Sequence, residues 1–176
     1  MTELPVLRAP GPDDAQAVAE LHYRSWVATY GLKITPDEAG RLTLAERVEH
    51  WERLLRERPR DRGALVAERE SRVVGLVEWE IGPEGHRAIG EIHAIHVAPE
   101  ERGRGVGTAL LAAAVEAMRS LAVRRAVLWV LDANSAAKRF YERHGWEGNG
   151  TSVERPLGGF ADFPLVIEVR YVLDLV

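Results

Sequence analysis

The stretch GEIHAIHVAPEERGRGVGTALL, residues 90–111, decides the fold because it joins a strand, a glycine-rich loop and a helix. Its first eight residues alternate in character, which predicts a strand that ends near Val97. Pro99 cannot continue a strand ladder, and an apolar stripe at helical spacing begins at Val106. The first N–H groups of such a helix lack intrahelical partners and lie at the positive end of its dipole. The arrangement therefore suits a phosphate ligand, although a plain tight turn with solvated arginines is the alternative interpretation.

The spacing of the glycines tests which phosphate ligand the loop suits. A P-loop needs a Lys after its last glycine, and none follows here. The dinucleotide fingerprint needs glycines at offsets 0, 2 and 5, and the third position is Thr108 or Leu110 instead. The pattern that fits is Arg-x-x-Gly-x-Gly at residues 102–107.

This pattern resembles motif A of the GCN5-related N-acetyltransferase (GNAT) family, whose loop holds the pyrophosphate of acetyl-coenzyme A (acetyl-CoA). A second resemblance lies at residues 128–146, where a strand is followed by Asn134, a helix carrying Phe140-Tyr141, and Gly145-Trp146, as in the family's motif B. By this resemblance the pyrophosphate contacts are Arg102, Gly103, Arg104, Gly105, Val106, Gly107 and Thr108.

Composition limits the other classes of function. The chain has 176 residues, 46% of them hydrophobic and 28% charged, and a net charge of −4 with mixed signs. This suits one domain over residues 1–176, without a nucleic-acid or membrane partner. The chain has no cysteine, which excludes disulfides and a thiol nucleophile. The N-terminal residues lack a secretory pattern, so a cytoplasmic protein is expected.

The remaining sequence predicts a mixed α/β fold. Strands are expected at residues 4–8, 64–70, 72–81, 91–97, 125–131 and 165–175, with residues 64–81 forming a hairpin around Ser71. Residues 82–85 are expected to be a loop. Thr35-Pro36-Asp37-Glu38 and Thr43-Leu44-Ala45-Glu46 both fit capping boxes. The order β-α-α-β-β-β-α-β-α-β-β predicts a mixed sheet with helices on both faces. The resemblance implies a mostly antiparallel sheet of about seven strands, in which the parallel strands of motifs A and B splay apart.

The same resemblance assigns roles along the cleft between those strands. Ile95, His96 and Val97 would line the pantetheine arm of acetyl-CoA, and Asn134 would bond it. Tyr141 would be the general acid beside the sulfur. Read from the residues alone, without the first motif, Tyr141 is better explained as a core aromatic on an amphipathic helix, and Asn134 as a plain helix N-cap, which could coexist with a ligand contact.

Two residues compete as the base that deprotonates the acceptor amine. Glu91 stands eleven residues before Arg102, the offset of the catalytic Glu in the histone-acetylating members. His93 is the rival because its unperturbed pKa is near neutrality; a water chain between sheet residues is the third possibility. Alternation places Glu91 and His93 on one face and His96 on the other unless a bulge intervenes, so no metal site is expected.

The expected function is N-acetylation of a primary amine, on a small molecule or a peptide, by direct transfer from acetyl-CoA. Trp26, Tyr30, Tyr23, Trp79, Glu78 and Glu80 are candidates for the acceptor walls. A non-catalytic acyl-CoA-binding module and a different nucleotide-binding α/β protein are the alternatives. The long last strand suggests a homodimer.

Overall fold

The computed structural model describes residues 5–30, 43–57, 59–84, 87–157 and 163–175. The elements are β1 (Val6–Arg8), a 3-10 turn (Pro12–Asp14), α1 (Ala15–Tyr30), α3 (Leu44–Glu57), β2 (Arg62–Arg69), β3 (Arg72–Glu84), β4 (Arg87–Val97), a second 3-10 turn (Pro99–Glu101), α4 (Val106–Ser120), β5 (Arg125–Leu131), α5 (Ser135–Arg143), β6 (Glu147–Pro156) and β7 (Leu165–Asp174). This order confirms the predicted succession of strands and helices.

The strands form one seven-stranded sheet in the order β1-β2-β3-β4-β5-β7-β6. Only β4 and β5 pair in parallel, and the other neighbours are antiparallel. The mixed, mostly antiparallel sheet is therefore confirmed. β7 pairs with β5 on one side and β6 on the other, so the last long strand does not offer a free edge to a second chain; β6 does.

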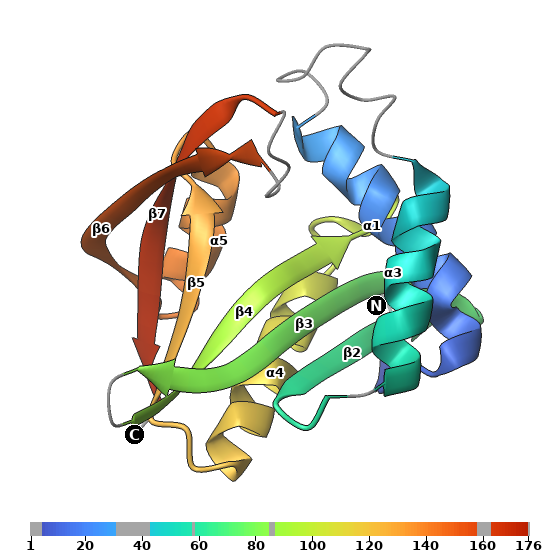
Figure 1. Ribbon diagram of the computed structural model, residues 1–176, viewed down its shortest axis with the longest axis horizontal. Coiled ribbons are helices and arrows are strands. Elements are labelled where there is room, and N and C mark those ends of the chain that lie inside the picture. The colour runs from blue at the N-terminus through green and yellow to red at the C-terminus, as the bar shows by residue number, and fades with distance from the viewer. Residues whose placement is uncertain (1–4, 31–42, 58, 85–86, 158–162, 176) are drawn as a thin grey trace.

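The parallel pair is short. Residues Gly90–Ile92 of β4 pair with Ala126–Leu128 of β5, and beyond this point the two strands diverge, as Figure 1 shows. The sheet is thereby divided into a β1–β4 part and a β5–β7 part, and the C-terminal half of β4 keeps only β3 as a neighbour.

Helices cover both faces of the sheet (Figure 1). α4 packs so closely under β3 that a Cβ added to Gly75 would lie 2.7 Å from side-chain atoms of Val106 and Leu110. α1 and α3 cover the opposite face, where His22 of α1 stacks on His96 of β4 with ring centroids 4.5 Å apart. The core between these layers includes Trp51 of α3, which is fully buried.

Local signals in the sequence fix several boundaries. Thr43 and Glu46 form the expected capping box: the Glu46 N–H donates to Thr43 Oγ1 at 3.2 Å, and the Thr43 N–H donates to Glu46 Oε2 at 3.3 Å. The box proposed at residues 35–38 lies outside the described residues. The hairpin turn is made by Glu70 and Ser71, both at positive φ. The loop expected at residues 82–85 is wrong in its first part, because β3 continues through Gly82 and Pro83 to Glu84, paired with the start of β4.

Candidate functional site

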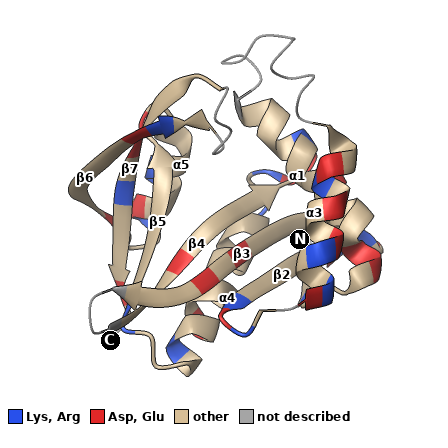
Figure 2. Ribbon diagram, in the orientation of Figure 1, with Lys and Arg blue, Asp and Glu red and all other residues tan. Residues whose placement is uncertain are grey.

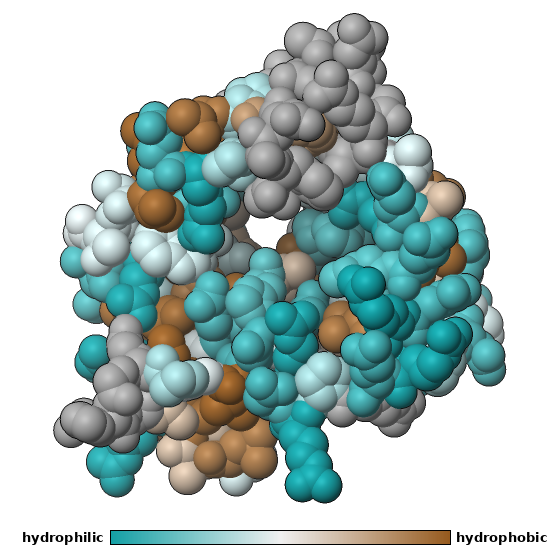
Figure 3. Space-filling view, in the orientation of Figure 1, coloured by the Kyte–Doolittle hydropathy of each residue, from teal (hydrophilic) through white to brown (hydrophobic). Residues whose placement is uncertain are grey.

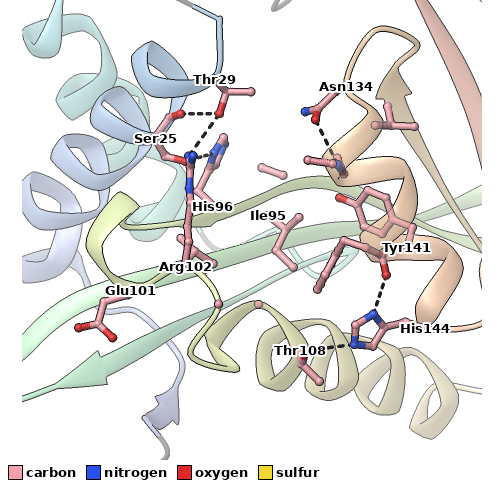
Figure 4. A pocket seen from close by; sticks show the side chains of 18 of the residues that line it. Ser25, Thr29, Ile95, His96, Glu101, Arg102, Thr108, Asn134, Tyr141 and His144 are labelled. Atoms are coloured by element: carbon pink, nitrogen blue, oxygen red, sulfur yellow. Dashed lines mark hydrogen bonds between the residues drawn. The ribbon is translucent and has the colours of Figure 1, made fainter. Parts of the chain in front are cut away.

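A cleft of about 850 Å³ opens where β4 and β5 part. Its walls are residues 93–97 of β4, the glycine loop, α5 and one side of α1 (Figure 4). The space-filling view shows the molecule hollowed between the two parts of the sheet (Figure 3). β5 does not pair with this part of β4. One edge of β4 therefore faces the cleft, and its peptide groups are not hydrogen-bonded to a neighbouring strand there.

The three glycines of the loop have two different functions. Gly103 and Gly105 adopt φ of 76° and 84°, a region that side chains disfavour, and a Cβ at either would meet nothing within 4 Å. Gly105 is the N-cap of α4, so the unpaired N–H groups of the first helical turn border the cleft. Gly107 instead permits close packing, since its Cβ would lie 3.4 Å from the Phe140 ring.

The two loop arginines, predicted together as phosphate ligands, point in different directions. Arg102 lines the cleft, and its Nη2 donates to Thr29 Oγ1 at 3.4 Å. Arg104 donates from Nη1 to the buried carboxylate of Glu101 at 3.1 Å and is not among the lining residues. In this structure the side chain of Arg104 is therefore engaged with Glu101, while its backbone belongs to the loop.

α5 brings Asn134 and Tyr141 to the wall opposite α1 (Figure 4). Asn134 Oδ1 accepts a hydrogen bond from the Ala137 N–H at 3.1 Å, which confirms the N-cap reading. The cap leaves the amide Nδ2 of Asn134 as a donor for another partner. Tyr141 is 7% exposed and contacts the rings of Phe140, Trp146 and Tyr171. It is thus a core aromatic that also lines the cleft, which confirms the core interpretation, and its role as general acid stays a prediction.

His144 is a lining residue that the sequence did not single out. Its Nδ1 lies 2.7 Å from the Phe140 carbonyl, which can only accept, so Nδ1 carries the proton. Nε2 then accepts from Thr108 Oγ1 at 3.0 Å. This bond ties the end of α5 to the first turn of α4. The position of His144 at the C-cap of α5 was the only available signal.

A β-bulge re-aims the side chains of β4. Glu78 of β3 pairs with Ala94, but the next residue, Trp79, pairs with Ile92, so His93 is an extra residue on β4. The expectation that His96 faces away from Glu91 and His93 is wrong for this reason. The bulge shifts the alternation, and His96 contacts α1 through Ser25 Oγ at 3.2 Å.

The bulge brings His93, which lines the cleft, into contact with charged side chains of β3 and β4. His93 Nε2 lies 3.3 Å from Glu80 Oε2, and His93 Nδ1 lies 3.7 Å from Glu91 Oε1. Arg62 contacts Glu80 at 2.8 Å and Glu78 at 3.5 Å. Figure 2 shows these acidic positions side by side on β3 and β4. Burial raises the pKa of Glu78. Of the two candidate bases, His93 is among the residues that line the cleft, whereas Glu91 is not and contacts the His93 ring.

His96, which lines the cleft, and His22 behind it form a stacked pair of half-buried histidines. Burial lowers the pKa of His22 to about 2, and the neighbouring His96, Arg47 and His50 add to the effect. Burial also lowers the pKa of His96 to about 4, with Arg47 and Arg102 contributing. Arg47 Nη1 lies 3.0 Å from His22 Nε2. Both rings are therefore neutral in the folded protein at neutral pH.

Two of the aromatic candidates for an acceptor wall are buried and do not line the cleft. Trp79 is 6% exposed and belongs to the main core, where its indole lies against Gly63, so it is not a wall of the cleft. Trp26 is also buried, with Leu157 and Phe163. Within the described ranges, no three His, Asp or Glu residues are grouped to hold a metal ion. No helix of the described part of the chain is long and apolar enough to cross a membrane.

Comparison with known proteins decides the family. The model of the acetyltransferase (GNAT) family matches residues 16–146, which include β4, the glycine loop, β5 and α5. The chain belongs to the GNAT family. A mycothiol acetyltransferase of Thermobispora bispora is 38% identical over 87 residues, which are 48% of this chain and 30% of that protein. An uncharacterized N-acetyltransferase of Methanocaldococcus jannaschii is 40% identical over 88 residues, 48% of this chain and 39% of that protein. The matches thus span well under half the length of these relatives.

Solved structures reproduce the fold of this GNAT protein over almost its whole length. The PaiA N-acetyltransferase of Thermoplasma acidophilum, in complex with coenzyme A, superposes with a TM-score of 0.76 over 99% of both chains at 22% identity. A structure from Salmonella typhimurium with its cofactor acetyl-CoA gives a TM-score of 0.70 at 18% identity, covering 99% of this chain and 95% of the other.

Two substitutions distinguish the contribution of Asn134 as the N-cap of α5 from any contact that its side chain makes with a ligand. Asn134→Ala removes the cap acceptor and should lower the free energy of unfolding by about 1 kcal/mol. Asn134→Asp keeps an acceptor at the same place and should change it by no more than a few tenths of a kcal/mol, roughly the spread among good caps. Urea unfolding of the two variants measures the difference. Equal losses in both would contradict the capping geometry.

The lowered pKa values of His22 and His96 predict that the free energy of unfolding falls in acid. Their folded-state pKa values, about 2 and 4, lie below the usual 6.5. As the pH falls below 6.5 the unfolded chain therefore binds protons that the folded chain does not, and stability decreases. Each histidine can contribute up to about 1.4 kcal/mol per pH unit between its unfolded and folded pKa. Urea unfolding at pH 7, 6 and 5 should show this slope, and His22→Gln should reduce it. A slope that His22→Gln leaves unchanged would show that other groups cause the instability.

Proposed function

We propose that this protein is an N-acetyltransferase that moves the acetyl group of acetyl-CoA to a primary amine in a ternary complex. The observation that carries the proposal is the cleft that joins an open edge of β4 to a glycine loop at a helix N-terminus. Family membership and the names of the relatives support it.

The residues of the cleft fit the parts of acetyl-CoA. The loop from Gly103 to Thr108, with Arg102, offers backbone N–H groups and one guanidinium to a pyrophosphate. The free edge of β4 near Ile95 and Val97 offers strand-like hydrogen bonds to the pantetheine amides. Asn134 Nδ2 offers a further donor on the opposite wall.

The carboxylates beside His93 suit an amine acceptor. Glu80 and Glu91 attract a cationic amine, which must lose a proton before it can attack, since an alkylamine has a pKa of about 10.4. We assign the proton to His93, because it lines the cleft and is held between Glu80 and Glu91. Both carboxylates stabilise the imidazolium that forms. A small-molecule amine and a peptide amine both remain within this acceptor class.

Tyr141 is placed to complete the reaction from the other wall. His93 takes one proton from the cationic amine, so that the neutral nitrogen can attack. As the C–N bond forms and the C–S bond breaks, Tyr141 gives its hydroxyl proton to the leaving sulfur, and the second proton lost by the nitrogen returns to the tyrosine oxygen. His93 then releases its proton to solvent. The chain has no cysteine, so transfer does not pass through an enzyme thioester.

Calorimetric titration with acetyl-CoA tests the cofactor site. The wild type should bind with micromolar affinity, and Arg102→Ala/Gly105→Glu should weaken binding by about 100-fold or more, because it removes a cation and adds an anion where the pyrophosphate would lie. Arg119→Ala/Gly150→Glu is a matched control: Gly150 also has positive φ in open space, but on β6. Absence of wild-type binding would contradict the proposal. Binding without release of the coenzyme A thiol in the presence of a panel of amines would favour a non-catalytic acyl-CoA-binding module.

The pH dependence of kcat/KM tests the base. His93→Gln should lower kcat/KM by about 100-fold at pH 7, the usual lower bound for a general base. The loss should shrink at higher pH, where more of the acceptor is already neutral. Glu91→Gln should cause a smaller loss of the same shape, and Glu154→Gln on β6 should cause none. If Glu91→Gln has the larger effect, Glu91 is the base; unchanged profiles in both variants would leave deprotonation to water.

A further inference from the structure

Beneath the glycine loop lies a buried carboxylate that neither the sequence pattern nor the proposed chemistry uses. Glu101 ends the 3-10 turn that leads into the loop and is 5% exposed. Two arginines approach it: Arg104 Nη1 lies 3.1 Å from Oε1, and Arg69 Nη1 lies 3.4 Å from Oε2. Arg69 is the last residue of β2 and its side chain is 13% exposed. The cluster therefore joins the loop to the β2–β3 hairpin.

A buried anion next to a phosphate-binding loop would ordinarily weaken phosphate binding. Two features of this cluster remove the conflict. Glu101 is among the residues that line the cleft, but Figure 4 shows its carboxylate directed away from the centre. The two guanidiniums outnumber the one carboxylate, so the cluster of Arg69, Glu101 and Arg104 carries a net positive charge.

The geometry also fixes the backbone. The Glu101 carbonyl accepts from the Arg104 N–H at 3.3 Å, while the Glu101 side chain holds the Arg104 guanidinium, so residue 104 is held at both ends. The residues on either side of it, Gly103 and Gly105, are the two at positive φ. Glycine is the most permissive residue of the backbone, so this loop needs an external restraint to keep its N–H groups aimed in one direction.

We propose that Glu101 is a positioning residue for the pyrophosphate loop, acting through Arg104 and anchored by Arg69. This rests on the proposed use of acetyl-CoA. Its role is to hold Gly103–Gly107 in the conformation that binds the ligand before the ligand arrives, by fixing the guanidiniums of Arg104 and Arg69 beneath the loop. It contributes to the pyrophosphate end of the ligand and not to the thioester end.

Comparing acetyl-CoA with S-acetylpantetheine, which lacks the pyrophosphate, tests this role. Glu101→Gln should weaken acetyl-CoA binding by calorimetry about tenfold or more, the usual effect of losing a charge-assisted hydrogen bond. The KM for S-acetylpantetheine and the kcat with either donor should stay within about twofold of wild type, a change of under half a kcal/mol. Arg104→Ala should reproduce the effect, and the double variant should add little. Glu100→Gln is the matched control, because that neighbour is exposed and pairs with Arg24 of α1.

The outcomes separate the inference from the proposed function. Wild-type affinity of Glu101→Gln and Arg104→Ala for acetyl-CoA would overturn the positioning role while leaving the function intact. Equal losses for both acetyl donors, or a loss of folding in Glu101→Gln while Arg104→Ala keeps wild-type affinity, would assign Glu101 a purely structural role. If the wild type binds no acetyl-CoA, the positioning role falls with the proposed function.

Discussion

The site depends on one interruption of backbone hydrogen bonding, the point at which β4 loses β5. After three residue pairs the parallel ladder stops, and the rest of β4 is paired only with β3. Backbone N–H and C=O groups away from water need partners. An open strand edge inside a cleft therefore favours an extended ligand that carries amides of its own. The cleft lies where β4 and β5 separate, and α5, which follows β5 in the chain, forms one of its walls.

Because of the bulge at His93, the two faces of β4 contact different elements of the structure. Residues after the bulge keep Ile95 and Val97 on the side of α4 and α5 and place His96 against α1. The extra residue itself is brought between Glu80 and Glu91. Arg102 and the start of α4 make one end of the cleft cationic, while His93 at the β4 end is in contact with the carboxylates of Glu80 and Glu91. The proposed reaction uses this difference, because its donor has an anionic end and its acceptor is an amine.

Much of this was predictable because the signals are local. The glycine spacing, the N-cap at Asn134 and the capping box at Thr43 are determined by neighbouring residues, and the alternation of β4 identified a strand. What failed depends on distant partners. The bulge is set by the register between β3 and β4, which alternation within one strand cannot report, and so His96 was placed on the wrong face.

The arginines show the same limit. The sequence assigns both Arg102 and Arg104 to the pyrophosphate, and the structure separates them, because Arg104 is bonded to Glu101 while Arg102 lines the cleft. His144 was missed for a related reason, since its partner Thr108 is 36 residues away. The roles assigned to Tyr141, Glu91, His93 and the loop residues remain predictions of the geometry, now with defined partners.

Amide hydrogen exchange followed by mass spectrometry, with and without saturating acetyl-CoA, directly tests whether the ligand binds along the open edge of β4 and the glycine loop. If the open edge of β4 and the glycine loop hold the ligand, peptides covering residues 93–97 and 103–108 should exchange more slowly in its presence, while β2 and β6 should not change. If acetyl-CoA slows exchange in other segments and leaves residues 93–97 unchanged, the ligand does not bind along the open edge of β4.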